Sequence, residues 1–225
     1  MSENSRIGFR INYDRSLPKE ADIAALRSYS TCNLADGLNN FYTVAPGIYA
    51  MFPCRMAGPA LTVRLRPADN LMLHKAIDLI RPGDILVVDA QGCPDYCVCG
   101  ELMVSSMLGK GAAGIIVDGM VRDIAELREI GLPVFAKGTC PNVGDKTGPG
   151  EINYPVVCGG VPVHPGDVIV GDENGVVVIP IDDISQVLAG AEKKYRAEAL
   201  RRDEIKKGLF VRPDIDKHLR DQGIL

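Results

Sequence analysis

The sequence lacks the features that mark several well-defined classes of protein. It has no tryptophan and only three histidines in 225 residues, and no apolar run approaches the ~20 residues of a membrane-spanning helix. Residues 1–15 contain no hydrophobic segment of the signal-peptide kind. With 25 Lys+Arg against 29 Asp+Glu the net charge is −4, whereas domains that bind nucleic acid are usually strongly basic. We therefore expect neither a membrane nor a nucleic acid as partner.

The cysteines indicate a reducing compartment. There are seven of them, an odd number, and the sequence has no Asn-x-Ser/Thr acceptor site for glycosylation. Both features favour a cytoplasmic protein over a secreted one. The local group Cys93, Cys97 and Cys99 matches no common zinc-site spacing. We expect ordinary thiols there.

Three familiar ligand-binding motifs are missing or incomplete. No Gly-x-Gly-x-x-Gly follows a strand, which argues against a dinucleotide site and against a glycine-rich methyltransferase loop. The segment Gly144-Asp145-Lys146-Thr147 ends like a phosphate-binding P-loop, but an aspartate stands where the glycine is required. The histidines His74, His164 and His218 lie far apart in the sequence. We expect them to be surface or packing residues.

The apolar pattern predicts a mixed α/β fold. Residues 84–90, 113–119 and 132–137 form short apolar runs, separated by the amphipathic segments 101–110 and 123–130. Such alternation favours parallel strands joined by right-handed crossovers. Further helices are expected at 19–29, 31–38 and 70–80, and a further strand at 60–66.

From residue 139 onward the sequence no longer alternates between apolar runs and amphipathic segments. Residues 139–150 are rich in Gly and Pro and predict a long loop. Residues 161–180 predict two strands joined at Asp172-Glu173-Asn174-Gly175, since Asn-Gly between apolar runs is a strong hairpin signal. From residue 182 onward, apolar residues at helical spacing predict a long C-terminal helix.

Two segments combine reactive side chains with the start of a helix. The first is Gly100-Glu101-Leu102-Met103 and the second is Val121-Arg122-Asp123. Ligands bind at the carboxyl ends of the strands in open α/β sheets, where helix N-termini present free N–H groups. The backbone amides of Leu102 and Met103 and the guanidinium of Arg122 suit an anionic ligand. The carboxylates of Glu101 and Asp123 suit Mg²⁺ or Mn²⁺.

Structural roles explain the same residues nearly as well. Asp123 and Glu126 have the spacing of a capping box, so Asp123 could be only a helix cap. Glu101 in a first helical turn is favoured by the helix dipole. Arg122 fits this alternative less well, because a cation at a helix N-terminus is electrostatically unfavourable.

A family resemblance bears on this choice. The stretch GELMVSSMLGKGAAGIIVDGMVRDIAEL closely resembles the family that contains the class II 4-hydroxy-4-methyl-2-oxoglutarate aldolases and the RraA ribonuclease regulators. Three further segments resemble the same family: PGDILVVDAQG, LPVFAKGTCPN and VHPGDVIVGDENGVVVIP. Aldolase members carry an acidic residue, twenty intervening residues and then Arg-Asp. This chain has Glu101, residues 102–121 and then Arg122-Asp123.

The resemblance implies a role for each residue. Asp123 would bind the divalent metal, Mg²⁺ or Mn²⁺, directly, and Arg122 would hold the pyruvyl carboxylate of the substrate. Gly100, Glu101, Leu102 and Met103 would line the substrate pocket. Glu101 replaces the aspartate of many relatives and would act through water. An acidic residue from the C-terminal helix of a neighbouring subunit, for which Glu198 is the candidate, would lie near the metal.

The resemblance also implies a fold, an assembly and a reaction. The fold would be a single swivelling β/β/α domain over 1–225, a mixed sheet with flanking helices, with an N-terminal extension to about residue 25 and a C-terminal helix and tail from about 182. It would assemble as a homotrimer or a dimer of trimers. The reaction would be metal-dependent retro-aldol cleavage of a 4-hydroxy-2-oxo diacid to pyruvate, with oxaloacetate decarboxylation as a side activity and a metal-activated water as base. The alternative is a non-catalytic regulator of a ribonuclease.

Overall fold

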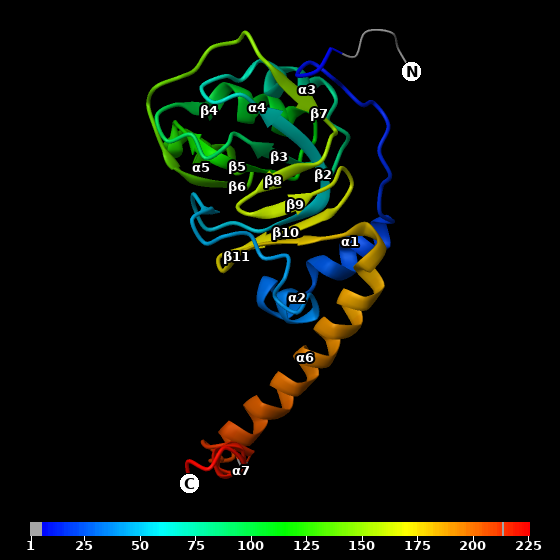
Figure 1. The fold of residues 1–225 in the computed structure, drawn as a ribbon, viewed down its shortest axis with the longest axis vertical. Helices are drawn as coiled ribbons and strands as arrows, with labels where there is room; N and C mark the ends of the chain where they lie inside the picture. The colour runs from blue at the N-terminus through cyan, green and yellow to red at the C-terminus, as the bar shows by residue number, and fades with distance from the viewer. Residues whose placement is uncertain (1–5, 213) are drawn as a thin grey trace.

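The computed structural model describes residues 6–212 and 214–225, so the first five residues of the expected N-terminal extension lie outside the described part. Its helices and strands alternate through the first two thirds of the chain (Figure 1). The helices are α1 (Glu20–Arg27), α2 (Thr31–Gly37), α3 (Leu71–Asp78), α4 (Glu101–Gly109), α5 (Ile124–Ile130), the 3₁₀ turn η1 (Ile181–Asp183), α6 (Ile184–Lys206) and α7 (Asp214–Asp221).

The strands form one large mixed sheet and one small one. The nine-stranded sheet contains β1 (Tyr49–Ala50), β2 (Met56–Leu65), β3 (Ile85–Asp89), β4 (Cys97–Cys99), β5 (Gly114–Val121), β6 (Val134–Thr139), β7 (Gly150–Ile152), β10 (Val168–Asp172) and β11 (Gly175–Ile179). The pair β8 (Val156–Cys158) and β9 (Val161–Val163) forms the two-stranded sheet.

The centre of the large sheet is parallel, as the alternation of strands and helices predicts. Strands β2, β3, β5 and β6 pair in parallel in the order β6-β5-β3-β2. Strand β3 is buried along its whole length, which is typical of a parallel strand covered on both faces. Antiparallel strands β1, β7, β10 and β11 extend the sheet at its margins. The parallel strands therefore end at one common edge, after Leu65, Asp89, Val121 and Thr139.

Three groups of buried apolar residues fill the two faces of this sheet. Helices α3, α4 and α5 contribute Leu73, Val104 and Leu127 to one core. The small sheet β8-β9 covers a second core around Phe135. Helices α1, α2 and α6 pack on β10 and β11 through a third core that includes Leu34 and Val187. The arrangement confirms the expected α/β class, a mixed sheet with flanking helices.

The expected element boundaries hold for most of the chain and are wrong at four places. Strand β2 begins at Met56, four residues before the expected start. The region 161–180 contains three strands rather than two, because β9 precedes the confirmed hairpin β10-β11. The predicted loop 139–150 overlaps the last residue of β6 and the first of β7. The sequence does not predict strand β4, since three residues are too few for a visible alternation.

The long C-terminal helix is confirmed and extends away from the sheet (Figure 1). Its first half is anchored by Ile184, Val187 and Ala191, which are buried, while Tyr195 packs edge-on against Tyr29 with 6.2 Å between ring centroids. Beyond this point α6 carries exposed apolar side chains such as Leu200. No helix in the described residues is both long and apolar enough to cross a membrane.

Candidate active site

The twenty-residue spacing between Glu101 and Arg122 follows from one crossover of the sheet. Strand β4 runs parallel to β5 and pairs with its end, with Cys99 opposite Val121. The chain leaves β4 at Gly100, passes through α4, returns along β5 and reaches Arg122 beside its starting point. The backbone N–H of Arg122 donates to the carbonyl of Cys99 at 3.1 Å. Two helix starts that are distant in sequence are thereby adjacent at the carboxyl edge of the sheet.

Asp123 links these two helix starts. Its backbone has a left-handed conformation with φ +62°, which is uncommon for a residue other than glycine, although aspartate tolerates it better than most. The side chain makes no capping bond to α5, the helix that it precedes. Instead its Oδ2 accepts a hydrogen bond from the backbone N–H of Glu101, the first residue of α4, at 3.0 Å. The capping-box alternative for Asp123 and Glu126 is therefore wrong.

Arg122 lies against this carboxylate and remains half-exposed. Its Nε is 3.4 Å from Asp123 Oδ2, with 41% of the Arg122 side chain and 36% of the Asp123 side chain accessible. No other acceptor within the described residues pairs with the guanidinium, so its outer N–H groups can bind a ligand carboxylate. The neighbouring aspartate also offsets the unfavourable placement of a cation at the start of α5.

Gly100 makes this close approach possible. A Cβ at this position would lie 2.2 Å from Asp123 Oδ2 and 2.8 Å from Arg122 Cγ. The backbone of Gly100 is extended, so the requirement is for space rather than for an unusual conformation. A glycine is needed because the Arg122 and Asp123 side chains occupy the volume that any other side chain would take.

The first turn of α4 presents backbone donors next to these side chains. Glu101 uses its N–H to bind Asp123. The N–H groups of Leu102 and Met103 have no acceptor in the described part of the chain, as expected for the first turn of a helix. The Met103 side chain is buried, whereas the Leu102 side chain is 77% exposed. Glu101 is exposed and its carboxylate is open to solvent.

A cavity of about 140 Å³ brings most of the predicted residues together with others from distant segments. Gly100, Leu102, Met103, Arg122 and Asp123 line it, as the sequence predicts, whereas Glu101, which is expected to line it too, is not among the lining residues, because its side chain at the start of α4 is exposed to solvent. The remaining lining residues were not predicted to be functional; they are Asn70, His74, Cys97, Cys99, Val143 and Lys146. His74, expected from the sequence to be a surface or packing residue, instead lines the cavity. The order of the elements could have indicated this placement, because α3, which carries His74, follows the end of the parallel strand β2 at the same edge of the sheet.

The environment of the cavity alters the pKa of three of its lining groups. Burial raises the pKa of the Cys97 thiol and raises that of Cys99 to about 12. Both thiols are therefore protonated at neutral pH, which is unsuitable for a nucleophile or a thiolate ligand. Burial and the positive charge of Lys146 lower the pKa of His74. Its imidazole is neutral at pH 7 and can donate one hydrogen bond.

The chemistry of the oxygen donors fits a hard divalent cation. Asp123 supplies a half-exposed carboxylate, and Glu101 supplies a second one from the first turn of α4. The described residues contain no group of three or more His, Cys, Asp or Glu side chains placed to hold a metal ion. Mg²⁺ is commonly held by one or two carboxylates, with water and substrate oxygens completing its shell.

Glu198 is not near Asp123 within one chain. It lies on α6, where its Oε2 accepts from Asn33 Nδ2 at 3.2 Å and is 3.6 Å from Arg202 Nη1. The cavity that Glu198 lines is a different one, bounded also by Lys194, Arg201 and Arg212. A role for Glu198 beside the metal would require a second copy of the chain.

Comparison with known proteins identifies the family of this chain. A family model described as "RraA-like: Aldolase/RraA" matches residues 31–178, more than half of the chain. The chain belongs to the Aldolase/RraA family. A relative from Halalkalibacterium halodurans is 37% identical over 180 residues, which cover 80% of this chain and 86% of that protein, and it is named "Putative 4-hydroxy-4-methyl-2-oxoglutarate aldolase".

Solved structures of the family share the fold. The Streptomyces coelicolor protein RraAS2, described as an unusual member of the RNase ES inhibitor RraA family, is 29% identical. It superposes with a TM-score of 0.76 over 84% of this chain and 99% of that one. An RNA-processing inhibitor RraA from Thermus is 30% identical, with a TM-score of 0.63 over 67% of this chain and 92% of the other. The family thus includes proteins named as aldolases and proteins named as regulators.

Proposed function

We propose that the protein is a divalent-metal-dependent lyase that cleaves 4-hydroxy-4-methyl-2-oxoglutarate and similar 4-hydroxy-2-oxo diacids to pyruvate and a second 2-oxo acid. The observation that carries this proposal is the meeting of Arg122, Asp123 and the first-turn amides of α4 in one cavity. The aldolase name of the Halalkalibacterium relative supports it.

Arg122 and α4 bind the pyruvyl end of the substrate in this proposal. A guanidinium can grip a carboxylate through two parallel hydrogen bonds. The N–H groups of Leu102 and Met103 point from a helix N-terminus, where the backbone dipoles favour negative charge. Together these groups hold the carboxylate and the 2-oxo group of the substrate in a fixed orientation beside Asp123.

Asp123 would hold Mg²⁺ or Mn²⁺ directly, and Glu101 would act through water. When bound, the cation supplies Lewis-acid stabilisation of the charge that develops on the 2-oxo oxygen, an effect of several kcal/mol. Asp123 is held in place for this role by the N–H of Glu101. Because the same bond fixes the start of α4, the carboxylate and the backbone donors keep one relative geometry.

The bond changes are those of a retro-aldol reaction. The 4-hydroxyl loses its proton, the C3–C4 bond breaks, and C4 becomes the carbonyl carbon of the released 2-oxo acid. The bonding pair passes to the pyruvyl fragment, which takes up a proton at C3 to give pyruvate. We assign to Glu101 the orientation of the water that receives the hydroxyl proton. Oxaloacetate decarboxylation leaves the same three-carbon fragment and is therefore the expected side activity.

The proposed assembly is a homotrimer or a dimer of trimers in the cytoplasm. In it, Glu198 of α6 would approach the Asp123 site of a neighbouring copy. The projection of α6 beyond the sheet and the exposed apolar residues near its end support such a contact. All seven cysteines are unpaired, which agrees with a reducing compartment.

The decisive experiment measures pyruvate release from 4-hydroxy-4-methyl-2-oxoglutarate with added Mg²⁺ or Mn²⁺, and again after chelation. We expect turnover that is lost with the chelator and restored by the metal. Absence of release from this substrate and from oxaloacetate, in the presence of either metal, would overturn the proposal.

A regulator of ribonuclease activity is the second candidate. The structural similarity to RraAS2 over nearly the whole of that protein favours it. Inhibition of a purified ribonuclease of the RNase E type by the wild-type chain and equally by Asp123→Asn, together with no pyruvate release, would establish the regulator in place of the lyase.

A further inference from the structure

Two polar side chains line the active-site cavity without a partner of their own. His74 comes from α3, and Lys146 comes from the irregular segment between β6 and β7. Within residues 6–212 and 214–225, no carboxylate oxygen lies within the 4.0 Å ion-pair distance of Lys146 Nζ, and the His74 ring makes no hydrogen bond. Among the described residues, five of the nine other lysines form an ion pair, as Lys75 does with Asp78 at 2.7 Å.

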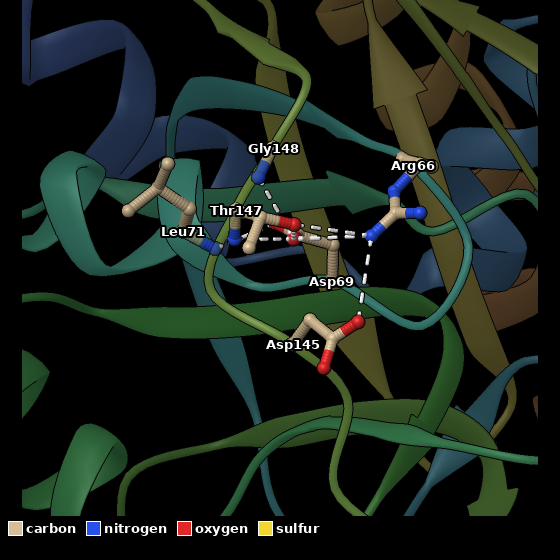
Figure 2. A network of polar contacts seen from close by, with 6 residues as sticks. All are labelled: Arg66, Asp69, Leu71, Asp145, Thr147 and Gly148. Atoms are coloured by element: carbon tan, nitrogen blue, oxygen red, sulfur yellow. Dashed lines mark hydrogen bonds and ion pairs between the residues drawn. The ribbon is translucent and has the colours of Figure 1, made fainter.

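One buried carboxylate holds together the two backbone segments that carry these side chains. Asp69 is 1% exposed and lies between β2 and α3. Its Oδ1 accepts from the N–H of Leu71 at 2.9 Å, at the start of the helix that carries His74. Its Oδ2 accepts from the N–H groups of Thr147 and Gly148, each at 2.8 Å, directly after Lys146 (Figure 2).

Backbone contacts reinforce this connection. The N–H of Asn70 donates to the carbonyl of Asp145 at 3.0 Å, and the N–H of Asp145 donates to the carbonyl of Ala68 at 2.7 Å. Gly144 passes so close to Ala68 that a Cβ there would lie 2.1 Å from the Ala68 oxygen. The segment that carries Lys146 is therefore held against the start of α3, and the backbone at Lys146 has a fixed place beside the cavity, although its side chain is exposed.

The charges of the cavity favour a ligand with two negative groups. Two of its lining side chains are cationic, Arg122 and Lys146, and only one lining carboxylate, Asp123, balances them. Arg122 already has a ligand group in the proposed reaction, the pyruvyl carboxylate. No ligand group is yet assigned to Lys146. Because an unpaired cation beside a cavity can bind an anion, Lys146 is available for a second negative group of the ligand.

We infer that Lys146, with the His74 ring as a hydrogen-bond donor beside it, binds the second carboxylate of a 2-oxo diacid whose first carboxylate is bound by Arg122. The inference rests on the proposed function and deepens it. Lys146 is the residue that makes the site select dicarboxylic over monocarboxylic substrates, and Asp69 is the positioning residue that places it.

Ligand binding tests this assignment without requiring turnover. The probes are 2-oxoglutarate, which has both carboxylates and cannot undergo the cleavage, and 2-oxopentanoate, which has the same chain length and only one. Their affinities are measured by calorimetry in the presence of Mg²⁺. The wild-type chain should bind 2-oxoglutarate more tightly. Lys146→Ala should weaken the binding of 2-oxoglutarate about 10- to 100-fold, the range for a charged hydrogen bond, and change the affinity for 2-oxopentanoate less than about twofold.

Matched variants separate the carboxylate contact from general effects. Lys75→Ala removes a lysine adjacent in sequence to His74 that is already paired with Asp78, and it should leave both affinities unchanged. Lys146→Arg should restore most of the preference, because the positive charge is retained. His74→Ala should weaken 2-oxoglutarate about two- to tenfold, as expected for a neutral hydrogen bond. Thermal unfolding of each variant reports whether the fold is intact.

The outcomes distinguish this inference from the aldolase proposal. Three outcomes would overturn the assignment of Lys146. Lys146→Ala could lose affinity for both ligands equally, it could lose affinity for neither, or the wild-type chain could bind 2-oxoglutarate no more tightly than 2-oxopentanoate. Lys146-dependent binding of 2-oxoglutarate without pyruvate release from any 4-hydroxy-2-oxo acid would support the assignment and overturn the lyase chemistry instead.

Discussion

The carboxylate of Asp123 caps α4, the helix that begins at Glu101, and not α5, the helix that it precedes. Asp123 has a left-handed backbone, and its side chain is directed toward the N–H of Glu101. One hydrogen bond of 3.0 Å thus connects the two helix starts of the site. The predictions below test what this connection and its surroundings contribute.

The first prediction concerns the space at Gly100. Gly100→Ala should lower kcat/KM about 100-fold, because the new Cβ forces Asp123 and Arg122 away from their positions, and shifts of about 1 Å have effects of that size. Loss of the α4 cap should reduce the free energy of unfolding by about 1 kcal/mol. Pyruvate-release kinetics and urea unfolding measure the two effects.

The matched control is Gly109→Ala at the other end of α4. A Cβ there meets nothing within 4 Å, so activity should be unchanged and stability should rise by about 0.4–1 kcal/mol. Full activity in Gly100→Ala would show that the close approach of Asp123 to Gly100 has no catalytic importance.

The second prediction separates the charge of Asp123 from its capping role. Asp123→Asn keeps an oxygen that can accept from Glu101 but removes the charge that would bind the cation. Metal-dependent turnover should fall at least about 10³-fold, while the free energy of unfolding should change by less than about 1 kcal/mol. A calorimetric titration with Mg²⁺ should show that the variant binds the cation more weakly than the wild type.

Glu126→Gln is the control for Asp123, because Glu126 is the second residue of the capping box that does not form. It should leave stability and turnover unchanged. Metal-dependent turnover that persists in Asp123→Asn would exclude Asp123 as a direct ligand.

The third prediction concerns the geometry of Arg122. Arg122→Lys keeps the positive charge but cannot form two parallel hydrogen bonds to a carboxylate. We expect kcat/KM to fall about 10- to 100-fold, with a corresponding loss of pyruvate affinity. Arg128→Lys, on the exposed face of α5, provides the comparison and should behave as wild type. Unchanged kinetics in Arg122→Lys would rule out the bidentate contact.

The fourth prediction concerns the pH dependence of stability. Burial disfavours the charge of Asp69, but the N–H groups of Thr147, Leu71 and Gly148 outweigh it and lower the pKa of this carboxyl below its ordinary value of 3.8. A carboxyl with a depressed pKa in the folded state contributes stability above its unfolded pKa and loses it as the pH falls through the folded pKa. The contribution of Asp69 should therefore be complete above about pH 5, begin to fall near the unfolded pKa of about 3.9, and be lost only when the pH drops below the folded pKa, which lies under 3.8.

Asp69→Asn provides the difference measurement. Its free energy of unfolding should be about 1–3 kcal/mol lower than that of the wild type at pH 7, because the charged acceptor is lost, and the two curves should converge in acid. A constant difference across this range would show that ionisation of Asp69 does not stabilise the loop. Other acidic residues contribute equally to both curves and cancel.

The sequence alone predicts the parallel centre of the sheet, the hairpin β10-β11, the long C-terminal helix and about half of the site, but not the short strands such as β4 and β9. Apolar runs alternating with amphipathic segments predict the parallel centre of the sheet, because this periodicity is a local property. The interval from Glu101 to Arg122 also reflects a local unit, the crossover from β4 through α4 to β5. The sequence predicts that Glu101 and Arg122 meet because both segments stand just before a helix at the carboxyl edge of the sheet, although the short strand β4 itself is not visible in the sequence.

Only the tertiary structure decided what completes the site. His74 and Lys146 are separated by 71 intervening positions (75–145), and no pattern near either residue indicates the other. They share a cavity because Asp69, buried between β2 and α3, must satisfy its oxygens with backbone N–H groups from both segments. The function of Asp123 likewise depends on which helix its side chain reaches. Such choices are set by long-range packing and hydrogen bonding, which local sequence patterns do not record.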